Sequence, residues 1–434
     1  MRYVIGKTLK HTLSPQIHGF LGDGFYGIKE LEEGEVEQFV SHGDWSGLNV
    51  TIPYKQTVMR LLDGVDTVSR EIGAVNTVVR VCGQKIGFNT DVYGMEYALS
   101  RAGIDLNGKS VLILGSGGAG RCAEYVAKKS GAKSVAVVSR KGELNYTNCY
   151  DRQDVQIVIN ATPVGMYPDI AQSPVELCAF LCLEGVFDCV YNPLRTRFVQ
   201  SATALGVKVA SGLDMLVEQA RVSHMIFVAG QRIDSEVKNG KIAKITTCEA
   251  IDAIESDVRI VNFVDVDKIT QNIVENIKRL QRNVVLIGMG GAGKTTVGRA
   301  FAKATGRVFF DVDEQIEREC GDVLSNIVKN EDAFRRIERQ TVRNLSEKQG
   351  AVIACGGGVV LDGENIKNLK CNGILVWIKR SGFQSGLLYP SVDEAKRVYE
   401  KREPLYADAS DCEIQNDGSV QSAVEKLVEI CKIL

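Results

Sequence analysis

Short apolar runs alternate with amphipathic segments along most of the chain. From residue 110 the runs "SVLILG", "SVAVVSR", "VQIVINAT", "GVFDCVYN" and "GVKVASG" recur at the spacing of strands that helices separate. A second series starts at "NVVLIG" and continues through "RVFFDVD", "GAVIACGGG" and "GILVWIK". Such alternation is typical of parallel sheets with helices on both faces. The pattern therefore predicts two α/β domains, the second of which occupies residues 282–434.

The first 92 residues carry an α/β pattern of their own. Strands are expected at "YVIG", "FYGIKEL", "LNVTI", "AVNTVVR" and "KIGFN". Ser14 and Pro15 predict a helix start, with serine as the cap and proline in the first helical position. Between the two later series, residues 246–281 place Ile269, Ile273 and Ile277 at helical spacing. This segment is therefore expected to be an ordered linker that contains a helix.

Composition narrows the class of partner. The chain has 434 residues, of which 44% are hydrophobic, and 52 basic residues stand against 54 acidic ones. A net charge of −2 gives no basis for binding nucleic acid or an anionic membrane, so small molecules are the expected partners. No signal or transit pattern opens the sequence, which favours a cytoplasmic protein. The 12 cysteines include no C-x-x-C pair and are expected as reduced thiols; Cys178 and Cys182 are better explained by core packing than by metal binding.

The stretch "VLILGSGGAGRCAEYVAKKSG" predicts a strand, a tight turn and a helix. Gly115, Gly117 and Gly120 match G-x-G-x-x-G, with Gly118 and Ala119 inside the loop. This motif places a dinucleotide pyrophosphate at the N-terminus of the helix, as in a Rossmann-type domain. The next strand ends in Ser139, Arg140 and Lys141 rather than in an acid, and two cations suit a 2′-phosphate. The expected cofactor is therefore NADP(H).

A hydride acceptor also needs a proton source. "NVTIPYK" carries Asn49, Thr51 and Lys55 at a strand end, and "GFNTDVYG" carries Asp91 at a turn into a helix. A lysine and an aspartate form a plausible proton-transfer pair for the interconversion of a carbonyl and an alcohol. Lys55 and Asp91 are therefore the candidate catalytic residues.

A series of eight motifs runs through the first half of the chain. Over residues 1–245 it comprises "KHTLSPQIH", "NVTIPYK", "GAVNTV", "GFNTD", "GSGGAG", "INATPVGM", "DCVYNPLRT" and "GLDMLVEQA". In these motifs and their order, this half resembles shikimate dehydrogenase. The resemblance implies a catalytic pair of Lys55 and Asp91 and places Thr162 at the cofactor. It also implies that the substrate is bound by Thr12, Ser14, Thr51, Asn76, Asp91 and Gln219, with Tyr191 near the site. Thr12 replaces the usual serine, and "SRK" replaces the usual Asn-Arg-Thr; both retain the chemistry.

The stretch "GMGGAGKTT" has the spacing of a P-loop. Backbone N–H groups of this loop would surround the phosphates of a nucleotide. The predicted nucleotide-binding residues are Gly288, Gly290, Gly291, Ala292, Gly293 and Thr296. Lys294 would reach the terminal phosphates, and Thr295 would hold Mg²⁺. "VFFDVD" follows soon after, which favours a compact kinase with Asp311 near the metal and Asp313 at an acceptor hydroxyl. ATP and Mg²⁺ are the expected ligands.

This half resembles shikimate kinase through "GMGGAGKTT", "FFDVDEQIE", "EDAFRRIE", "IACGGGVV" and "KREPLY" over residues 282–434. The resemblance implies that Asp313 orients or deprotonates the 3-hydroxyl. It further implies that the shikimate carboxylate and ring are held by Arg335, Arg402 and the backbone of Gly356, Gly357 and Gly358. One departure concerns the lid, where Ser385 and Gly386 stand in place of the Arg-Pro of the family.

The expected fold is a mainly parallel α/β protein of several domains. A substrate domain would comprise residues 1–92 and 222–245, a Rossmann-type NADP domain residues 93–221, a linker residues 246–281, and a P-loop domain like that of nucleoside monophosphate kinases residues 282–434. The expected function is reduction of 3-dehydroshikimate followed by phosphorylation of shikimate. The alternative is a dehydrogenase for shikimate or quinate whose kinase half is a nucleotide-binding regulatory module. The oligomeric state is not predicted.

Overall fold

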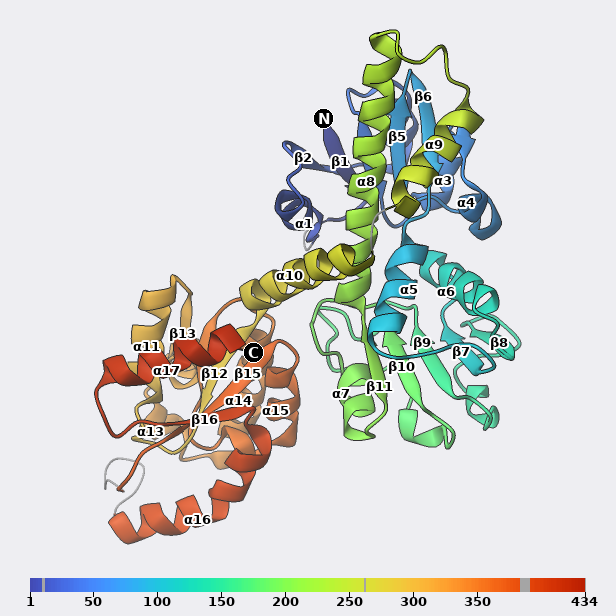
Figure 1. Ribbon diagram of the computed structural model, residues 1–434. Coiled ribbons are helices and arrows are strands. Elements are labelled where there is room, and N and C mark those ends of the chain that lie inside the picture. Colours follow the sequence, from blue (N-terminus) through green and yellow to red (C-terminus); the bar gives the residue numbers. More distant parts are fainter. Residues whose placement is uncertain (10–11, 261–262, 383–390, 434) are drawn as a thin grey trace. The chain divides into compact units, whose positions relative to one another are not determined.

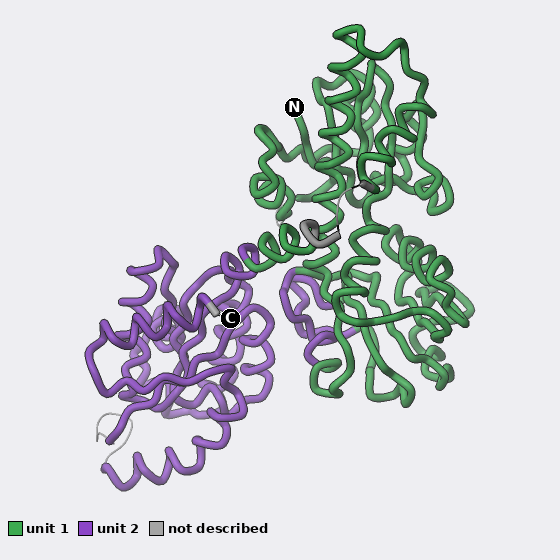
Figure 2. Tube along the Cα trace, viewed as in Figure 1, with its two compact units in different colours: residues 1–164, 174–191, 201–275 green, residues 165–173, 192–200, 276–434 purple. Residues whose placement is uncertain are grey.

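The structure, a computed structural model, describes residues 1–9, 12–260, 263–382 and 391–433 (Figure 1). It divides into two compact units, of which the first comprises residues 1–164, 174–191 and 201–275 (Figure 2). The second unit comprises residues 165–173, 192–200 and 276–434. The predicted α/β fold class is confirmed: the described residues form three sheets with helices beside them, and two of these sheets are entirely parallel.

The first sheet has the strand order β2-β1-β3-β5-β6-β4. Its strands are β1 (Arg2–Gly6), β2 (Tyr26–Glu30), β3 (Gly47–Val50), β4 (Gly64–Val65), β5 (Thr77–Val81) and β6 (Gln84–Phe88). β5 is antiparallel to both of its neighbours, whereas β1 pairs in parallel with β2 and β3. The associated helices are α1 (Ser14–Phe20), α2 (Glu33–His42), α3 (Lys55–Met59), α4 (Thr67–Ile72), α8 (Gly212–Lys238) and α9 (Thr247–Ile260).

Apolar residues from distant segments cover this sheet. Val79 and Phe88 of the sheet pack with Phe227 of α8 and with Ala250 and Ile254 of α9. Figure 1 shows α8 and α9 beside β5 and β6. The close approach requires glycine, because a Cβ at Gly47 would lie 2.6 Å from the ring of Phe227. Part of the segment expected as a linker thus packs into the core of the first sheet.

The second sheet belongs to the same unit and has the order β11-β10-β9-β7-β8. Its strands, all parallel, are β7 (Ser110–Leu114), β8 (Ser134–Val138), β9 (Ile157–Asn160), β10 (Gly185–Asp188) and β11 (Lys208–Ser211). The connecting helices are α5 (Asp91–Arg101), α6 (Gly118–Lys129) and α7 (Arg197–Ala204), and short 3₁₀ turns lie at η1 (Cys149–Asp151) and η2 (Leu177–Ala179). Parallel strands place ligand sites at their carboxyl ends, where the glycine loop follows β7.

The third sheet, in the second unit, has the order β13-β14-β12-β15-β16. Its parallel strands are β12 (Asn283–Ile287), β13 (Phe309–Asp311), β14 (Val352–Ala354), β15 (Gly373–Lys379) and β16 (Cys412–Gln415). Its helical segments are α10 (Phe263–Gln281), α11 (Lys294–Thr305), α12 (Val312–Cys320), α13 (Leu324–Ile327), α14 (Glu331–Ser346), η3 (Val359–Leu361), α15 (Gly363–Lys370), α16 (Val392–Ala409) and α17 (Val420–Ile433). The boundary between the two units falls within α10.

The second unit also takes in two segments from the first half of the sequence. Arg195 donates from Nε to the carbonyl oxygen of Lys370 at 2.8 Å and from its backbone N–H to that of Cys371 at 2.9 Å. Tyr167 Oη donates to the carbonyl oxygen of Ser346 at 2.6 Å. These bonds satisfy backbone carbonyls at the ends of α14 and α15, where helices leave them without a partner of their own.

Two local expectations are wrong. Ser14 is the first residue of α1 rather than its cap, which is Leu13, and Ser14 Oγ accepts a hydrogen bond from Thr12 Oγ1 at 3.2 Å. Cys178 and Cys182 are exposed rather than in the core, because the turn around η2 buries Leu177 and Phe180 instead. All 12 cysteines are free thiols, as expected.

Candidate active sites

Lys55 and Asp91 lie together, and each is the first residue of a helix that follows a strand of the first sheet. Lys55 opens α3 soon after β3, and Asp91 opens α5 soon after β6. Lys55 Nζ lies 2.5 Å from Asp91 Oδ2, and the two side chains are 20% and 10% exposed. Asn76 Nδ2 donates to the other oxygen of Asp91 at 2.8 Å, and Asn76 Oδ1 accepts from the backbone of Thr90 at 2.7 Å. The pair is thus held in one orientation at the edge of a cavity.

That cavity gathers most of the residues predicted for substrate binding. Thr12 is not among the described residues that line the cavity. It donates a hydrogen bond to Ser14, which lines the cavity. Ala119 brings the glycine loop to the same space. Burial raises the pKa of Tyr191, so its hydroxyl keeps its proton. The predicted residues that line the cavity are Ser14, Thr51, Lys55, Asn76, Asp91, Ala119, Tyr191 and Gln219, together with Asn49.

A buried polar layer behind the cavity was not predicted from the sequence. Ser223 Oγ of α8 lies 2.6 Å from Thr77 Oγ1 and 3.1 Å from Thr90 Oγ1. Asn49 Nδ2 donates to the same Ser223 Oγ at 2.9 Å. Thr77 and Ser223 stand 146 residues apart in the sequence, so no local pattern signals their contact.

The first glycine loop has the geometry that its motif predicts. Gly115 has φ of 104°, a conformation that favours glycine. A Cβ on Gly120 would lie 2.0 Å from the carbonyl oxygen of Gly115, so α6 approaches the loop as closely as backbone allows. Gly117 is the cap of α6, which leaves the helix N-terminus open for a phosphate. Thr162 lies beside the loop, since a Cβ on Gly115 would come within 2.9 Å of its methyl group.

Ser139, Arg140 and Lys141 follow β8, the strand next to β7. Arg140 and Lys141 are exposed, and neither forms an ion pair with another residue in the described part of the chain. Their charges are therefore available to an anion. Gly142 keeps the turn compact, because a Cβ there would lie 2.6 Å from Ser139 Oγ.

In the second unit, the P-loop joins β12 to α11. Gly288, Gly291 and Gly293 have positive φ values of 138°, 83° and 93°. Lys294 is 8% exposed, and its Nζ donates to the carbonyl oxygens of Gly288 and Met289 at 2.8 Å each. Burial lowers the pKa of Lys294, a cost that a bound phosphate would offset. The remaining predicted loop residues, Gly290, Ala292 and Thr296, occupy the same turn and the first turn of α11.

Two oxygen donors meet beside the P-loop. Thr295 Oγ1 donates to Asp311 Oδ2 at 2.7 Å, and Asp311 Oδ1 caps α12 by accepting from the backbone of Asp313 at 3.0 Å. A hydroxyl and a carboxylate are the ligand types that Mg²⁺ prefers. The donor set therefore fits the expected ion.

Asp313 lines a cavity that two guanidinium groups also line. Burial and the nearby Asp311 raise the pKa of Asp313 to about 6. Arg335, Arg402 and Gly356 to Gly358 line the same cavity. Arg402 Nη1 donates to the carbonyl oxygen of Gly357 at 3.1 Å, and a Cβ on Gly358 would lie 2.5 Å from Arg335 Nη1. Two guanidinium groups thus converge on the space that Asp313 faces, and Glu331 and Glu338 line it as well.

Three residues that sequence reasoning missed hold this second site in place. Glu338, which is 1% exposed, accepts from Arg335 Nη1 at 2.7 Å and so fixes that guanidinium. Tyr406 Oη donates to Gly357 O at 2.5 Å, and Asn416 Nδ2 donates to Ala292 O at 2.8 Å. The spacing of Arg335 and Glu338, i to i+3 on one helix, is a signal that could have revealed the first of them.

The lid residues Ser385 and Gly386, with Leu387 and Leu388 after them, lie outside the described residues. Cations flank this segment on both sides. Lys379 pairs with Glu413 at 2.6 Å and lies over the ring of Trp377, whereas Lys396 and Arg397 are exposed on α16. Arg380 Nη1 donates to Gly291 O at 3.3 Å, which brings its guanidinium to the P-loop.

Comparison with known proteins matches a different family model to each of two parts of the chain. A model of the shikimate dehydrogenase substrate binding domain matches residues 4–78, and a model of shikimate kinase matches residues 290–384. The shikimate dehydrogenase (NADP(+)) of Caldicellulosiruptor bescii is 36% identical over 253 residues, which cover 52% of this chain and 88% of the relative. The corresponding protein of Clostridium perfringens is 37% identical over 238 residues, which cover 50% and 88%.

Solved structures resemble the same part of the chain. A chorismate mutase/shikimate 5-dehydrogenase fusion protein from Clostridium acetobutylicum superposes with a TM-score of 0.52 and 31% identity, covering 64% of this chain and 98% of that one. Shikimate dehydrogenase 1 from Peptoclostridium difficile gives a TM-score of 0.50 and 30% identity, with coverages of 59% and 96%. Among the described residues, no helix has the length and apolar character needed to cross a membrane.

Proposed function

We infer the function from the family: the chain belongs to the shikimate dehydrogenases, and it carries a shikimate kinase domain in its C-terminal part. It is a bifunctional enzyme. We propose that the first unit reduces 3-dehydroshikimate to shikimate with NADPH and that the second phosphorylates the 3-hydroxyl of shikimate with MgATP. The observation that carries the proposal is the pairing of Lys55 with Asp91 in a cavity that the glycine loop also lines.

In the reduction, Lys55 and Asp91 handle the proton. Bound NADPH supplies the hydride that forms the new C–H bond at the carbonyl carbon. As the C=O π electrons move to oxygen, that oxygen takes a proton from the Lys55–Asp91 pair. Asn76 Nδ2 donates to Asp91 Oδ1, which leaves Asp91 Oδ2 directed at Lys55. Ser14, Thr51 and Gln219 would bind the hydroxyls and carboxylate of the substrate.

The cofactor preference rests on the two cations after β8. Arg140 and Lys141 are exposed and close to the carboxyl end of β7, where the adenosine of a dinucleotide lies in this type of fold. A 2′-phosphate would accept charge-assisted hydrogen bonds from them. Relatives that share this half are named for NADP(+), which supports the same preference.

In the phosphorylation, Asp313 would accept the proton of the attacking hydroxyl. MgATP supplies the phosphoryl group, and Lys294 would neutralise charge on its terminal phosphates. Thr295 and Asp311 would hold Mg²⁺ through their adjacent oxygens. Arg335 and Arg402 would bind the shikimate carboxylate, while Gly356 to Gly358 let the ring approach the backbone.

The lid decides between a working kinase and a nucleotide-binding regulatory module. In phosphoryl transfer an arginine near the γ-phosphate can contribute about 10³–10⁵ in rate. Of the described flanking cations, Arg380 is the one bonded to the P-loop, which favours an active but slow kinase. Arg380→Ala should lower phosphorylation further, whereas Lys396→Ala, a matched control on the exposed face of α16, should not. Equal rates in the two variants would remove Arg380 from the mechanism.

One coupled assay tests the whole function. Purified protein receives 3-dehydroshikimate, NADPH and MgATP, and chromatography follows the appearance of shikimate 3-phosphate. The proposal expects shikimate first and its phosphate second. Oxidation of NADPH without any phosphorylation, while ATP is still bound, would favour the regulatory module. Faster oxidation of quinate than of shikimate in the reverse reaction would favour the alternative of a quinate dehydrogenase.

We also propose the domain organisation in outline. The first sheet with residues 222–245 would form the substrate domain and the second sheet, within residues 93–221, the NADP domain. The third sheet would form the kinase domain of residues 282–434, with residues 246–281 as the ordered linker. Two helices support an ordered linker: α9, which also packs into the core of the first sheet, and α10.

A further inference from the structure

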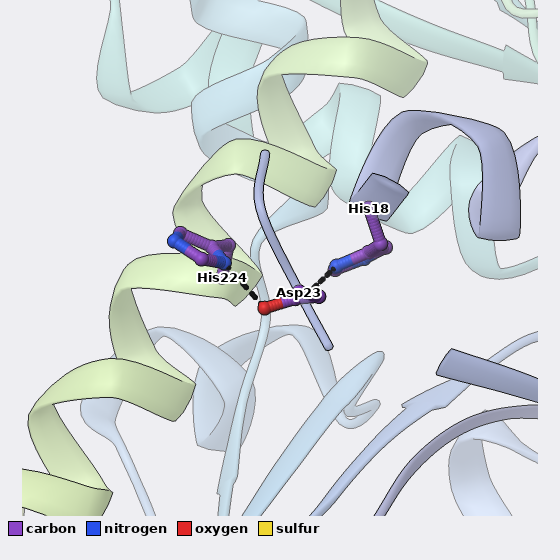
Figure 3. Close-up of side chains that lie close together, drawn as sticks. All are labelled: His18, Asp23 and His224. Carbon is purple, nitrogen blue, oxygen red and sulfur yellow. Dashed lines mark hydrogen bonds and ion pairs between the residues drawn. The ribbon is translucent and has the colours of Figure 1, made fainter. Parts of the chain in front are cut away.

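A group of titratable side chains surrounds Asp23, outside the reductase cavity (Figure 3). His18 Nδ1 of α1 lies 2.5 Å from Asp23 Oδ2, and His224 Nδ1 of α8 lies 2.7 Å from Asp23 Oδ1. Arg2 of β1 also donates to Asp23 Oδ1. The Asp23 side chain is 1% exposed, so three separate segments converge on one buried carboxylate.

The group has the donor atoms of a metal site, but its charges oppose one. The ligand atoms of His18, Asp23 and His224 all lie within 4.8 Å of one another. However, Arg2 donates to the same oxygen as His224, so a metal cation would meet the guanidinium charge at close range. Burial lowers the pKa of His18 to about 3 and that of His224 to about 4. Both imidazoles are therefore neutral at pH 7 and donate from Nδ1 to a carboxylate that Arg2 balances.

His18 stacks on Tyr26 and so restricts the orientation of the Tyr26 ring. The two rings stack with centroids 3.9 Å apart and planes 12° from parallel, and His18 is completely buried. Burial raises the pKa of Tyr26, so its hydroxyl remains a donor. Tyr26 Oη donates to Asn49 Oδ1 at 2.7 Å. The ring can hardly turn without breaking either the stack or this hydrogen bond.

Asn49 connects Tyr26 to the cavity. It lines the cavity beside Lys55 and Asp91, and its Oδ1 accepts from Tyr26. Its Nδ2 donates to Ser223 Oγ at 2.9 Å and to Thr77 Oγ1 at 3.3 Å, so both amide hydrogens have partners. An amide oxygen has two acceptor positions, and the second position of Oδ1 is left for a ligand that donates. The direction of this position depends on Tyr26, because the Tyr26 hydroxyl is the donor that fixes Oδ1.

We propose that Tyr26 is a positioning residue for the reductase substrate: its hydroxyl, fixed through His18 and Asp23, orients Asn49 Oδ1 to accept a hydrogen bond from a hydroxyl of the bound substrate. This inference rests on the proposed reduction of 3-dehydroshikimate.

The test uses the full-length chain with Tyr26→Phe, which removes the hydroxyl and retains the stacked ring. Tyr3→Phe is the matched control, because Tyr3 lies on the neighbouring strand and its hydroxyl contacts only Met1 Sδ among the described residues. We expect Tyr26→Phe to raise the KM for 3-dehydroshikimate about 5- to 10-fold, the ordinary effect of one hydrogen bond. The KM for NADPH and the thermal midpoint should match those of Tyr3→Phe, and kcat should change less than twofold.

A double-mutant cycle decides whether Tyr26 acts through Asn49. If it does, Tyr26→Phe has no further effect on KM in an Asn49→Ala background. Multiplying effects in the double variant would overturn the proposal. So would an unchanged substrate KM in Tyr26→Phe, or a loss of folding, which would make the role structural. A wild-type chain that does not reduce 3-dehydroshikimate would instead refute the proposed function, and the positioning role with it.

Discussion

The pH dependence of the kinase follows from the surroundings of Asp313. The side chain is buried beside Asp311, and these two influences raise its pKa to about 6. As a base it must be ionised to accept the proton of the shikimate hydroxyl. Activity should therefore be complete above this pKa and be lost as the pH falls through about 6.

The expected size of the loss is set by the ionised fraction. With a pKa of about 6, roughly nine-tenths of Asp313 is ionised at pH 7 and roughly one-tenth at pH 5. An ordinary aspartate near 3.9 would still be roughly nine-tenths ionised at pH 5. The kcat/KM for phosphorylation, which reports the pKa of the free enzyme, should thus fall about tenfold between pH 7 and pH 5.

The assay measures shikimate 3-phosphate at fixed excess Mg²⁺, with circular dichroism at each pH to confirm that the chain remains folded. Asp313→Asn should lower the rate on the order of 10²–10⁴-fold and abolish the pH step. Asp322→Asn, an exposed carboxylate just beyond α12, should leave both rate and profile unchanged. A wild-type kcat/KM that stays constant from pH 7 to pH 5 would show that Asp313 is not the base or that its pKa is not raised.

Three further outcomes are expected. Lys55→Ala should lower the reductase rate on the order of 10²–10⁴-fold and spare phosphorylation, whereas Lys294→Met should remove phosphorylation alone; a folded variant that loses both activities would contradict two independent sites. Arg140→Ala should weaken NADPH binding by about 1.5–3 kcal/mol and leave NADH binding nearly unchanged, and equal losses would assign Arg140 to the fold. His224 is neutral when folded, with a pKa of about 4 from burial and the charges of Arg2 and Arg221, but it gains a proton near pH 6.5 when unfolded. The free energy of unfolding should therefore decrease as the pH falls from 6.5 toward 4, and His224→Asn should make this decrease shallower in urea titrations; an unchanged slope would count against the buried imidazole.

Local chemistry explains what the sequence could reveal. Strands β1, β2, β3, β5 and β6 follow the expected apolar runs, and both glycine loops adopt the turns that their spacing requires. Gly115 and Gly293 need positive φ values, a demand that a motif of a few residues expresses completely. The two-residue strand β4 is too short to leave a periodic signal, and it was not expected.

Contacts between distant segments explain what the sequence could not reveal. Asn49 meets Ser223 across 174 residues, and Asp23 meets His224 across 201. Each of these residues is an ordinary polar side chain in its own segment, and only the packing of α8 on the first sheet brings them together. The same holds for α9, whose Ala250 and Ile254 enter that core although their segment lies between the two series of predicted strands. A motif therefore predicts the groups that we propose to touch phosphate or carry protons, because the turns that hold them are set by local geometry. The residues that hold these groups in place come from several helices and strands, and no one of those segments carries their pattern.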